Sequence, residues 1–252
     1  MRVASFNLLH GLSPDDGRVD PARLAAAVRS LDVDLLALQE VDRAQPRSGR
    51  LDLTAVAASA MGAVDHRFLP ALLGTPGGAW VPATEARPTD GPAYGIALLS
   101  RLPVTSWRVV RLPWLRVPVP LRLPGRRLPA VVREEPRVAL VAGVSSPAGP
   151  LTVAGTHLSF VPWWNTRQLR SLVAAATASP GPLLLLGDLN MGVGKAESVS
   201  GLRSVAEHPT FPADAPTRQL DHVLTDSPLQ ATSSEARATG LSDHCALVVD
   251  LS

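Results

Sequence analysis

The sequence predicts an α/β fold made of one domain, and three observations support this prediction. Apolar strand-like runs alternate with helix-like segments, and the middle of the chain is rich in strand-like runs. With 252 residues, 46% of them hydrophobic and 18% charged, the chain can bury a sizeable core and does not belong to the disordered class. No repeat or linker divides it, so we expect a single domain over residues 1–252.

The elements of the first hundred residues have recognisable ends. Asp20-Pro21 predicts the start of a helix, because aspartate caps helix N-termini and proline suits the first turn, and Gly62 predicts a helix end. In chain order we expect a strand over 1–8, a helix over 20–30, a strand over 34–39 that ends at Glu40, a helix over 51–61 and a strand over 96–100.

The second half of the chain continues the alternation. Ser146-Pro147-Ala148-Gly149 predicts a turn between two strands. We expect strands over 137–144, 151–156, 183–186, 220–224 and 246–251, and a helix over 164–178.

Three segments interrupt this regularity and are predicted to be loops: 73–91, 208–216 and 102–136. Residues 102–136 form an Arg/Pro-rich insertion that is too long for an ordinary connection and too rich in proline for a core helix or a central strand. From 101 to 137 the chain has nine arginines and seven prolines against two glutamates. Three roles stay open for this insertion: a clamp over substrate, a membrane-surface contact, or an extended edge packed on the domain.

Charge and cysteine content set weaker limits. The net charge of +2 gives little support for a polyanionic partner, and the one cysteine, Cys245, is interpreted as a small buried packing residue rather than a reactive thiol. No secretory leader and no run of 18 apolar residues is visible, so we expect a reducing, cytoplasmic setting.

Short polar motifs follow the apolar strand-like runs. Because strands deliver the residues that follow them to the rim of a sheet, we expect these motifs to converge on one site. Oxygen ligands together with imidazoles are suited to magnesium-assisted phosphate chemistry. The six motifs are Ser5-Phe6-Asn7, Leu38-Gln39-Glu40-Val41, Gly155-Thr156-His157-Leu158, Gly187-Asp188-Leu189-Asn190, Leu220-Asp221-His222-Val223 and Leu241-Ser242-Asp243-His244.

In this order and spacing the motifs resemble the endonuclease/exonuclease/phosphatase superfamily, the deoxyribonuclease-I-like metal-dependent phosphoesterases. The resemblance runs from Asn7 to His244. It implies a four-layer αββα sandwich, in which two mixed β-sheets pack face to face between helices, with the active site at one end of the sheets. The alternation of strands and helices alone also allows a doubly wound sheet.

The resemblance also implies a metal site. Glu40 is suited to be the principal Mg²⁺ or Mn²⁺ ligand, Asn7 to supply a neutral oxygen beside it, and Asp243 to be a second metal contact. Taken alone, Glu40 could be a solvated strand-end acid and Asn7 a turn residue.

The catalytic residues implied are His244, Asp221, Asp188, Asn190 and His157. His244 is the preferred general base and Asp221 would hold its second nitrogen, although Asp188 is also a candidate base. If the backbone is extended, Asp188 and Asn190 point to the same side and orient water and a phosphoryl oxygen. His157 would donate a hydrogen bond to the phosphate or protonate the leaving oxygen.

Residues further from these motifs have competing interpretations. Arg137 resembles a family arginine that neutralises phosphate charge, or it forms a surface ion pair; Tyr94 lines the cleft or packs in the core. Trp163-Trp164 lies at a membrane interface, stacks on a base, or covers the core. The remaining histidines are left out of the predicted site: His222, expected to point away from Asp221, and His10, His66 and His208.

Departures from the family's branches narrow the predicted substrate. Abasic-site endonucleases of this fold have a carboxylate where this chain has Leu9, and a tyrosine where it has His157. These differences favour deoxyribonuclease-like or sphingomyelinase-like members, many of which have an asparagine where this chain has Ile96.

The sequence therefore predicts a Mg²⁺-dependent hydrolase that cleaves a phosphodiester by in-line attack of water. The expected substrate is nucleic acid or a phospholipid head group, and we expect a monomer without an obligate protein partner. A phospholipid phosphodiesterase acting at a membrane surface, with peripheral membrane contact, is the first alternative. A non-catalytic binding module that keeps the fold is the second.

Overall fold

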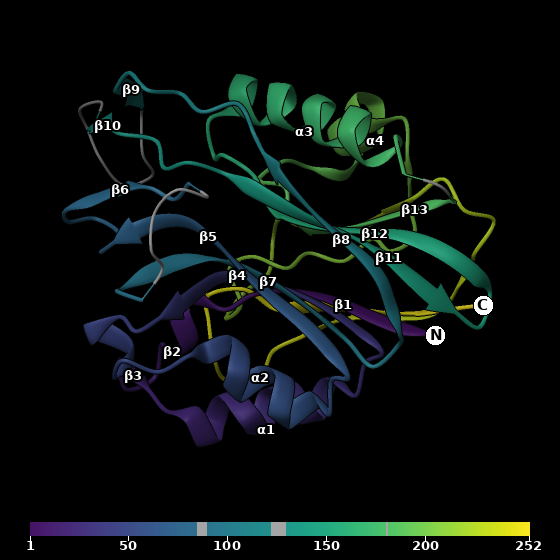
Figure 1. The fold of residues 1–252 in the computed structure, drawn as a ribbon, viewed down its shortest axis with the longest axis horizontal. Helices are drawn as coiled ribbons and strands as arrows, with labels where there is room; N and C mark the ends of the chain where they lie inside the picture. The colour runs from purple at the N-terminus through teal and green to yellow at the C-terminus, as the bar shows by residue number, and fades with distance from the viewer. Residues whose placement is uncertain (85–89, 122–129, 180) are drawn as a thin grey trace.

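Two large mixed β-sheets pack face to face in the computed structural model of the chain, which describes residues 1–84, 90–121, 130–179 and 181–252. Figure 1 shows α1 and α2 on the outer face of one sheet, and α3 and α4 on the outer face of the other. The first sheet has the order β16 (Ala231–Arg237), β17 (Ala246–Leu251), β1 (Arg2–Asn7), β4 (Leu35–Arg43), β7 (Ala93–Ser100), β5 (Asp65–Gly74) and β6 (Trp80–Pro82). The second has the order β14 (Arg203–Ser204), β15 (Asp221–Thr225), β13 (Leu183–Asp188), β12 (Gly149–His157), β11 (Val138–Ser146) and β8 (Val104–Arg111).

Smaller elements complete the described chain. The four helices are α1 (Pro21–Leu31), α2 (Leu53–Met61), α3 (Pro162–Ala176) and α4 (Val193–Ser200). Two short hairpins pair β2 (Leu12–Ser13) with β3 (Arg18–Val19) and β9 (Val119–Leu121) with β10 (Ala130–Val132), and two 3-10 turns span Leu9–Gly11 and Pro46–Ser48. Among the described residues, no helix is long and apolar enough to cross a bilayer.

Three hydrophobic clusters hold the four layers together. The central one lies between the sheets and joins residues such as Leu35 and Leu98 of the first sheet to Leu140 and Leu184 of the second. A second cluster packs α1 and α2 on the first sheet, and a third packs α3 and α4 on the other. This is the four-layer sandwich implied by the resemblance, and the doubly wound alternative is excluded.

The predicted helix ends are confirmed at α1 and α2. The Asp20 side chain accepts a hydrogen bond from the backbone N of Ala22 at 2.8 Å, and Pro21 opens the helix. Gly62 ends α2 with a φ of +70°, a left-handed conformation that glycine adopts at low cost.

Several predicted boundaries are wrong. The strand β4 does not end at Glu40 but continues to Arg43, with a bulge in its pairing to β7 between Leu38 and Val41. The predicted loop 73–91 contains β6 and the end of β5, whereas its residues 85–89 lie outside the described residues. Parts of 208–216 form an isolated bridge, and the remainder lies between regular elements.

The Arg/Pro-rich insertion 102–136 is not one loop. Its first part is β8, an edge strand that pairs with β11, which is why arginines and neighbouring prolines are tolerated there. Its second part includes the β9–β10 hairpin, and residues 122–129 lie outside the described residues. The expectation of an extended edge is thus correct for β8 alone.

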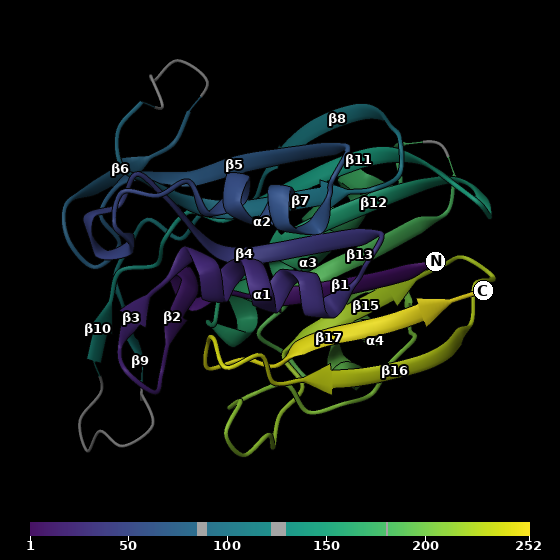
Figure 2. The same ribbon diagram turned by 90° about the horizontal axis from the view of Figure 1, so that it is seen from below.

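The strand directions bring the polar motifs to one end of the sandwich. The pairs β1–β4 and β12–β13 are parallel, so the carboxyl ends of these strands lie together, and the neighbouring strands β15 and β17 begin at that same end. In Figures 1 and 2 the chain termini lie at the opposite end from β6, β9 and β10.

Candidate active site

Three site residues lie side by side because of strand register. His157 at the end of β12 pairs with Asp188 at the end of β13, and Asp188 pairs with Asp221 at the start of β15. The Nε2 atom of His157 lies 3.4 Å from Oδ2 of Asp188. All three side chains are buried, so this row concentrates titratable groups in a low-dielectric environment.

The opposite sheet contributes Asn7 and Glu40. The Asn7 side-chain Nδ2 donates to Oδ2 of Asp188 at 3.1 Å and to Oε1 of Glu40 at 3.2 Å. Its Oδ1 accepts from the backbone N of Leu9 at 3.1 Å, which sets the orientation of the amide. Asn7 therefore bridges two carboxylates and joins the two sheets at the site.

A β-bulge aims Glu40. The residue has a φ of +55° at the point where the pairing of β4 with β7 shifts register. Bulges re-aim side chains next to functional sites, and a left-handed non-glycine residue stores a modest amount of strain. Without the bulge, β4 would pair regularly with β7, and the direction of the Glu40 side chain would follow from the alternation of the strand alone.

His244 is held by a buried chain of hydrogen bonds. Its Nδ1 donates to Oδ2 of Asp221 at 2.8 Å, and the same oxygen accepts from Oγ1 of Thr210 at 2.7 Å. The Nε2 atom on the other side of the ring faces Oδ2 of Asp188 at 4.0 Å. The Phe211 ring, with its centroid 4.9 Å from that of His244, covers the imidazole.

The predicted extended backbone at Asp188 and Asn190 is wrong. Asn190 has a φ of +51°, and its backbone N donates to Oδ1 of Asp188 at 2.9 Å, an Asx-type turn that asparagine tolerates well. Its side-chain Nδ2 donates to the Leu158 carbonyl at 3.1 Å and lies 3.4 Å from Nε2 of His157. The two side chains still reach one cavity, through a turn instead of a strand.

That cavity has a volume of about 320 Å³ and contains most of the predicted residues. Arg137 is buried and lines the cavity, and its Nε donates to Oε1 of Glu134 at 3.2 Å, so its ion pair is a buried one and the predicted surface ion pair is wrong. Tyr94 likewise is buried and lines it. The lining residues are Glu40, Tyr94, Arg133, Glu135, Arg137, His157, Phe160, Asp188 and Asn190.

Sequence reasoning missed several residues of the site. Arg133, Glu135 and Phe160 line the cavity, and Thr210 supports Asp221 from the predicted loop 208–216. Glu135 lies two residues before Arg137, so its closeness to that predicted residue could have indicated a place in the site. Thr210 carries no such indication, because its position follows from the path of a long loop.

Burial and neighbouring charges shift the pKa values of the site. Burial raises the pKa of Glu40, although the hydrogen bond from Asn7 opposes this. Burial and the Asp221 charge raise the pKa of Asp188 to about 7. Burial would lower the pKa of His244, but its hydrogen bond to Asp221 and the surrounding carboxylates raise it to about 9. Burial and the Arg137 charge hold the pKa of His157 well below 6.5, so this ring is neutral.

The residues present fit a divalent cation. Glu40 is half-buried and Asp188 is buried, and both carboxyl groups have raised pKa values. A bound cation would stabilise their ionised forms. Ligand atoms of Asp188, Asp221 and His244 also lie within 4.8 Å of one another. Asp243 is half-buried, its Oδ1 lies 3.5 Å from Oγ of Ser242, and its charge acts on Glu40.

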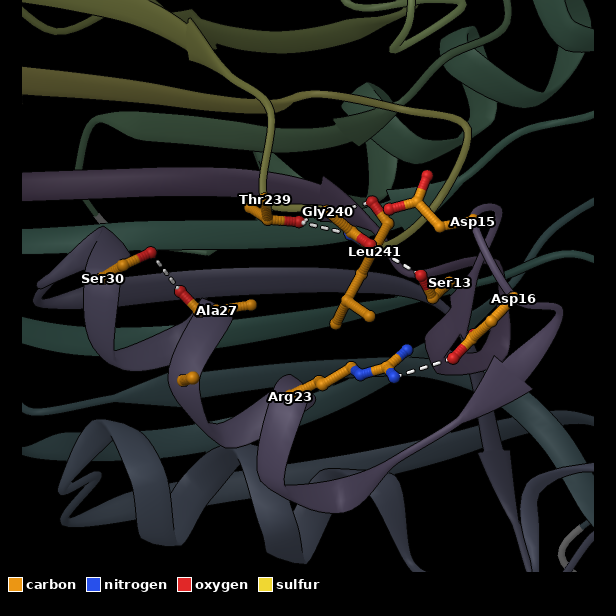
Figure 3. Close-up of a pocket in the computed structure, with 10 residues that line it drawn as sticks. Ser13, Asp15, Asp16, Arg23, Ala27, Ser30, Thr239, Gly240 and Leu241 are labelled. Carbon is orange, nitrogen blue, oxygen red and sulfur yellow. Dashed lines mark hydrogen bonds and ion pairs between the residues drawn. The ribbon is translucent and has the colours of Figure 1, made fainter.

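A larger concavity of about 490 Å³ lies behind the loop that carries His244. Figure 3 shows Arg23 from α1 reaching toward Asp16, and their atoms Nη2 and Oδ2 are 2.7 Å apart. Ser13 donates to the Gly240 carbonyl at 3.1 Å, and the backbone N of Ser242 donates to the Leu12 carbonyl at 2.8 Å. These contacts tie the loop that carries His244 to the β2–β3 hairpin.

The remaining predicted residues lie as follows. His222 points away from Asp221, and its Nε2 donates to the Met191 carbonyl at 2.7 Å. Trp164 is buried over the core, whereas Trp163 is 58% exposed. Of the other residues, Cys245 is buried, His66 is exposed, His10 is half-buried and His208 contacts Ser234.

Comparisons with known proteins identify the family and the fold of the chain. A family model described as the endonuclease/exonuclease/phosphatase family matches residues 4–244. No curated protein matches the chain. A solved endonuclease/exonuclease/phosphatase from Beutenbergia cavernae is similar over 100% of this chain and 71% of its own, with 24% identity and a TM-score of 0.72.

Two further solved structures share the fold. The mannosyl-6-phosphatase Bt3783 of Bacteroides thetaiotaomicron is 15% identical with a TM-score of 0.65, covering 100% of this chain and 99% of its own. The catalytic domain of human Nocturnin with a bound sulfate anion is 19% identical with a TM-score of 0.63, covering 100% and 94%. At these identities the similarity establishes the fold.

Proposed function

The chain belongs to the endonuclease/exonuclease/phosphatase family, and from this premise we propose that it is a divalent-metal-dependent hydrolase of phosphodiesters. One observation carries the proposal: Oδ2 of Asp188 lies within 4.0 Å of Asn7, His157 and His244, which come from three separate motifs and from both sheets. One partner is enough for a carboxylate with a purely structural role in a core. Asp188 has three partners and lines a cavity, which is typical of a functional site.

The metal would be Mg²⁺ or Mn²⁺, held by Glu40 and Asp243. Asn7 turns its Nδ2 to Glu40 and its Oδ1 to the backbone N of Leu9, so it would orient Glu40 instead of supplying the oxygen expected from the sequence. A bound Mg²⁺ lowers the pKa of nearby water and offsets the negative charge that grows on phosphoryl oxygens. The oxygen-rich donor set supports a hard cation.

The chain's own residues supply the proton transfers. Asp221 fixes the His244 ring through Nδ1, so Nε2 is directed toward Asp188. Near neutral pH the pKa of about 9 keeps His244 protonated, so Asp188, with a pKa of about 7, is the member of the pair that accepts the proton of the attacking water. This favours Asp188 over His244, the base preferred from the sequence. The pH profiles of Asp188→Asn and His244→Gln assign the first acceptor.

His157 acts as a neutral hydrogen-bond donor. Because its pKa is held well below 6.5, the ring has no extra proton to give to a leaving oxygen, and stabilising a phosphoryl oxygen is the role that fits. Asn190 lies beside it, and Asn165 donates to the Asn190 carbonyl at 2.9 Å, which keeps the amide in place. Arg137 adds a buried positive charge to the cavity wall.

The test is hydrolysis of bis(4-nitrophenyl) phosphate by purified protein with Mg²⁺, and again with EDTA. We expect activity only with the metal, and losses of about 10³-fold or more in Asp188→Asn and His244→Ala without loss of the fold by circular dichroism. His66→Ala, at an exposed histidine outside the cavity, is the matched control. Substantial turnover in either site variant would reject these roles, and no metal-dependent hydrolysis across a panel of phosphodiesters would favour the non-catalytic binding module.

A further inference from the structure

Exposed hydrophobic side chains gather at the end of the sandwich that contains the catalytic cavity, and one of them, Phe160, lines it. Six large hydrophobic side chains are exposed among the described residues: Val64 (69%), Val81 (39%), Val117 (61%), Val131 (75%), Phe160 (38%) and Trp163 (58%). All but Val64 belong to β6, to the β9–β10 region or to the start of α3. Figures 1 and 2 place β6, β9 and β10 at the end of the sandwich opposite the termini, where the catalytic motifs converge. We call these five residues the apolar rim.

Side-chain contacts connect one half of the rim to the cavity. Phe160 and Arg133 line the cavity together. The Arg133 guanidinium lies 4.3 Å from the centroid of the Trp80 ring, and Trp80 precedes the rim residue Val81. The rim therefore begins at the catalytic cavity itself.

A second set of contacts connects the other half. Trp80 and Trp114 have ring centroids 6.1 Å apart, and Leu115 packs in one cluster with Val161 and Trp164. Trp163 meets Trp164 edge to face at 5.4 Å. Trp114 and Trp164 each donate an indole hydrogen bond to a backbone carbonyl. These two tryptophans are therefore fixed in the protein and stabilise the segments that carry the exposed rim residues.

Three exposed arginines lie close to rim residues in the sequence. Arg116, Arg133 and Arg167 each stack over a tryptophan, at 5.3, 4.3 and 5.0 Å from the ring centroids of Trp114, Trp80 and Trp164 respectively. None of the three takes part in a salt bridge within the part of the chain that the structure describes. Stacking holds a guanidinium at the surface with its charge available to an external anion.

Aliphatic side chains between unpaired cations fit a lipid surface better than a nucleic acid. Three of the five rim residues are valines, which have no π-face on which a base could stack. At a bilayer, the valines, Phe160 and Trp163 would enter the interface while the arginines bind anionic head groups. Exposed apolar groups of this extent at one end of a protein mark an interaction site.

We propose that the apolar rim and its three arginines dock the protein on an anionic phospholipid bilayer, so that the phosphodiester presented to the cavity belongs to a lipid head group. The identity of the substrate rests on the proposed function, whereas docking itself requires no turnover.

The test is co-sedimentation with vesicles, carried out in EDTA so that no hydrolysis takes place. We expect wild-type protein to bind phosphatidylglycerol/phosphatidylcholine vesicles, and to bind pure phosphatidylcholine vesicles more weakly. The double variant V131N/W163Q should lower the partition coefficient by about tenfold, because it removes two apolar side chains from the interface without changing the charge. Arg116→Gln should weaken binding to the anionic vesicles only.

Val64→Asn is the matched control. Val64 is as exposed as Val131, but its backbone N bonds to the carbonyl of Ser100, at the end of β7 that pairs with the start of β4, far from the cavity. This variant should bind like wild type.

Three results would overturn the proposal: no binding of wild-type protein to anionic vesicles, an equal loss in Val64→Asn, or binding to a 30-residue oligonucleotide in place of vesicles. Turnover of a soluble chromogenic diester by wild-type protein is measured separately. Failure there would reject the proposed function and leave the docking result standing, whereas failure of sedimentation with intact turnover would reject docking alone.

Discussion

Replacing Asp221 with asparagine removes the charge that holds His244. In the folded protein Oδ2 of Asp221 accepts from both His244 and Thr210, and Asp221 is fully buried. The hydrogen bond and the charge of Asp221 are the two largest effects that raise the pKa of His244. We therefore expect Asp221→Asn to lower that pKa from about 9 toward the ordinary value of 6.5.

The size of the expected destabilisation follows from the pKa of His244. The pKa of His244 is about 9 against an ordinary 6.5, and each factor of ten in proton affinity corresponds to about 1.4 kcal/mol, so the interactions favour the imidazolium by about 3 kcal/mol. Because the folded pKa lies above the unfolded one, this stabilisation is fully present below pH 6.5 and is lost as the pH rises through about 9. The variant should thus be destabilised by up to about 3 kcal/mol at pH 6 and by much less at pH 9.5.

The assay has two parts, both in EDTA. An NMR titration follows the ring protons of His244, and urea unfolding at pH 6 and pH 9.5 gives the free energy of unfolding of both proteins. His222→Gln, at the neighbouring buried histidine whose Nε2 donates to the Met191 carbonyl, controls for general effects of substitution on this strand. An unchanged titration of His244, or the same destabilisation at both pH values, would refute the reasoning.

Two further predictions concern stability. A Cβ atom at Gly187 would lie 2.3 Å from the Thr156 carbonyl oxygen, so Gly187→Ala should reduce the free energy of unfolding by about 2 kcal/mol. It should also reduce activity, because it displaces Asp188. Gly194→Ala, which has open space around it, should change neither quantity when urea unfolding and turnover are measured in parallel. Asp20→Ala removes the N-cap of α1 and should cost about 1 kcal/mol in urea unfolding with unchanged activity; equal stability would show that the cap contributes nothing.

The elements that the sequence determined by itself are those with local causes. The strand over 246–251 is predicted to the residue, because a continuous apolar run needs only burial to become a central strand. The start of α1 at Asp20-Pro21 and the end of α2 at Gly62 are local conformational preferences of those residues. The polar motifs and their order also identified the family, because metal binding and catalysis require particular residue types.

The strands that the sequence analysis missed do not have strand-like sequences. The edge strand β16 has mostly polar, half-exposed residues, and β8 lies in an arginine-rich stretch, so neither shows the apolar pattern of a buried strand. Both are strands because a neighbour offers unpaired backbone groups, which is a tertiary condition.

The geometry of the site was decided only in three dimensions. Register between β12, β13 and β15 sets His157, Asp188 and Asp221 in one row, and the packing of two sheets brings Asn7 to Asp188 across 181 positions of sequence. The left-handed backbone of Glu40 is likewise imposed by pairing with β7. Residue types specify which groups take part, whereas distances and pKa values depend on burial and on contacts between distant segments, and these exist only in the folded chain.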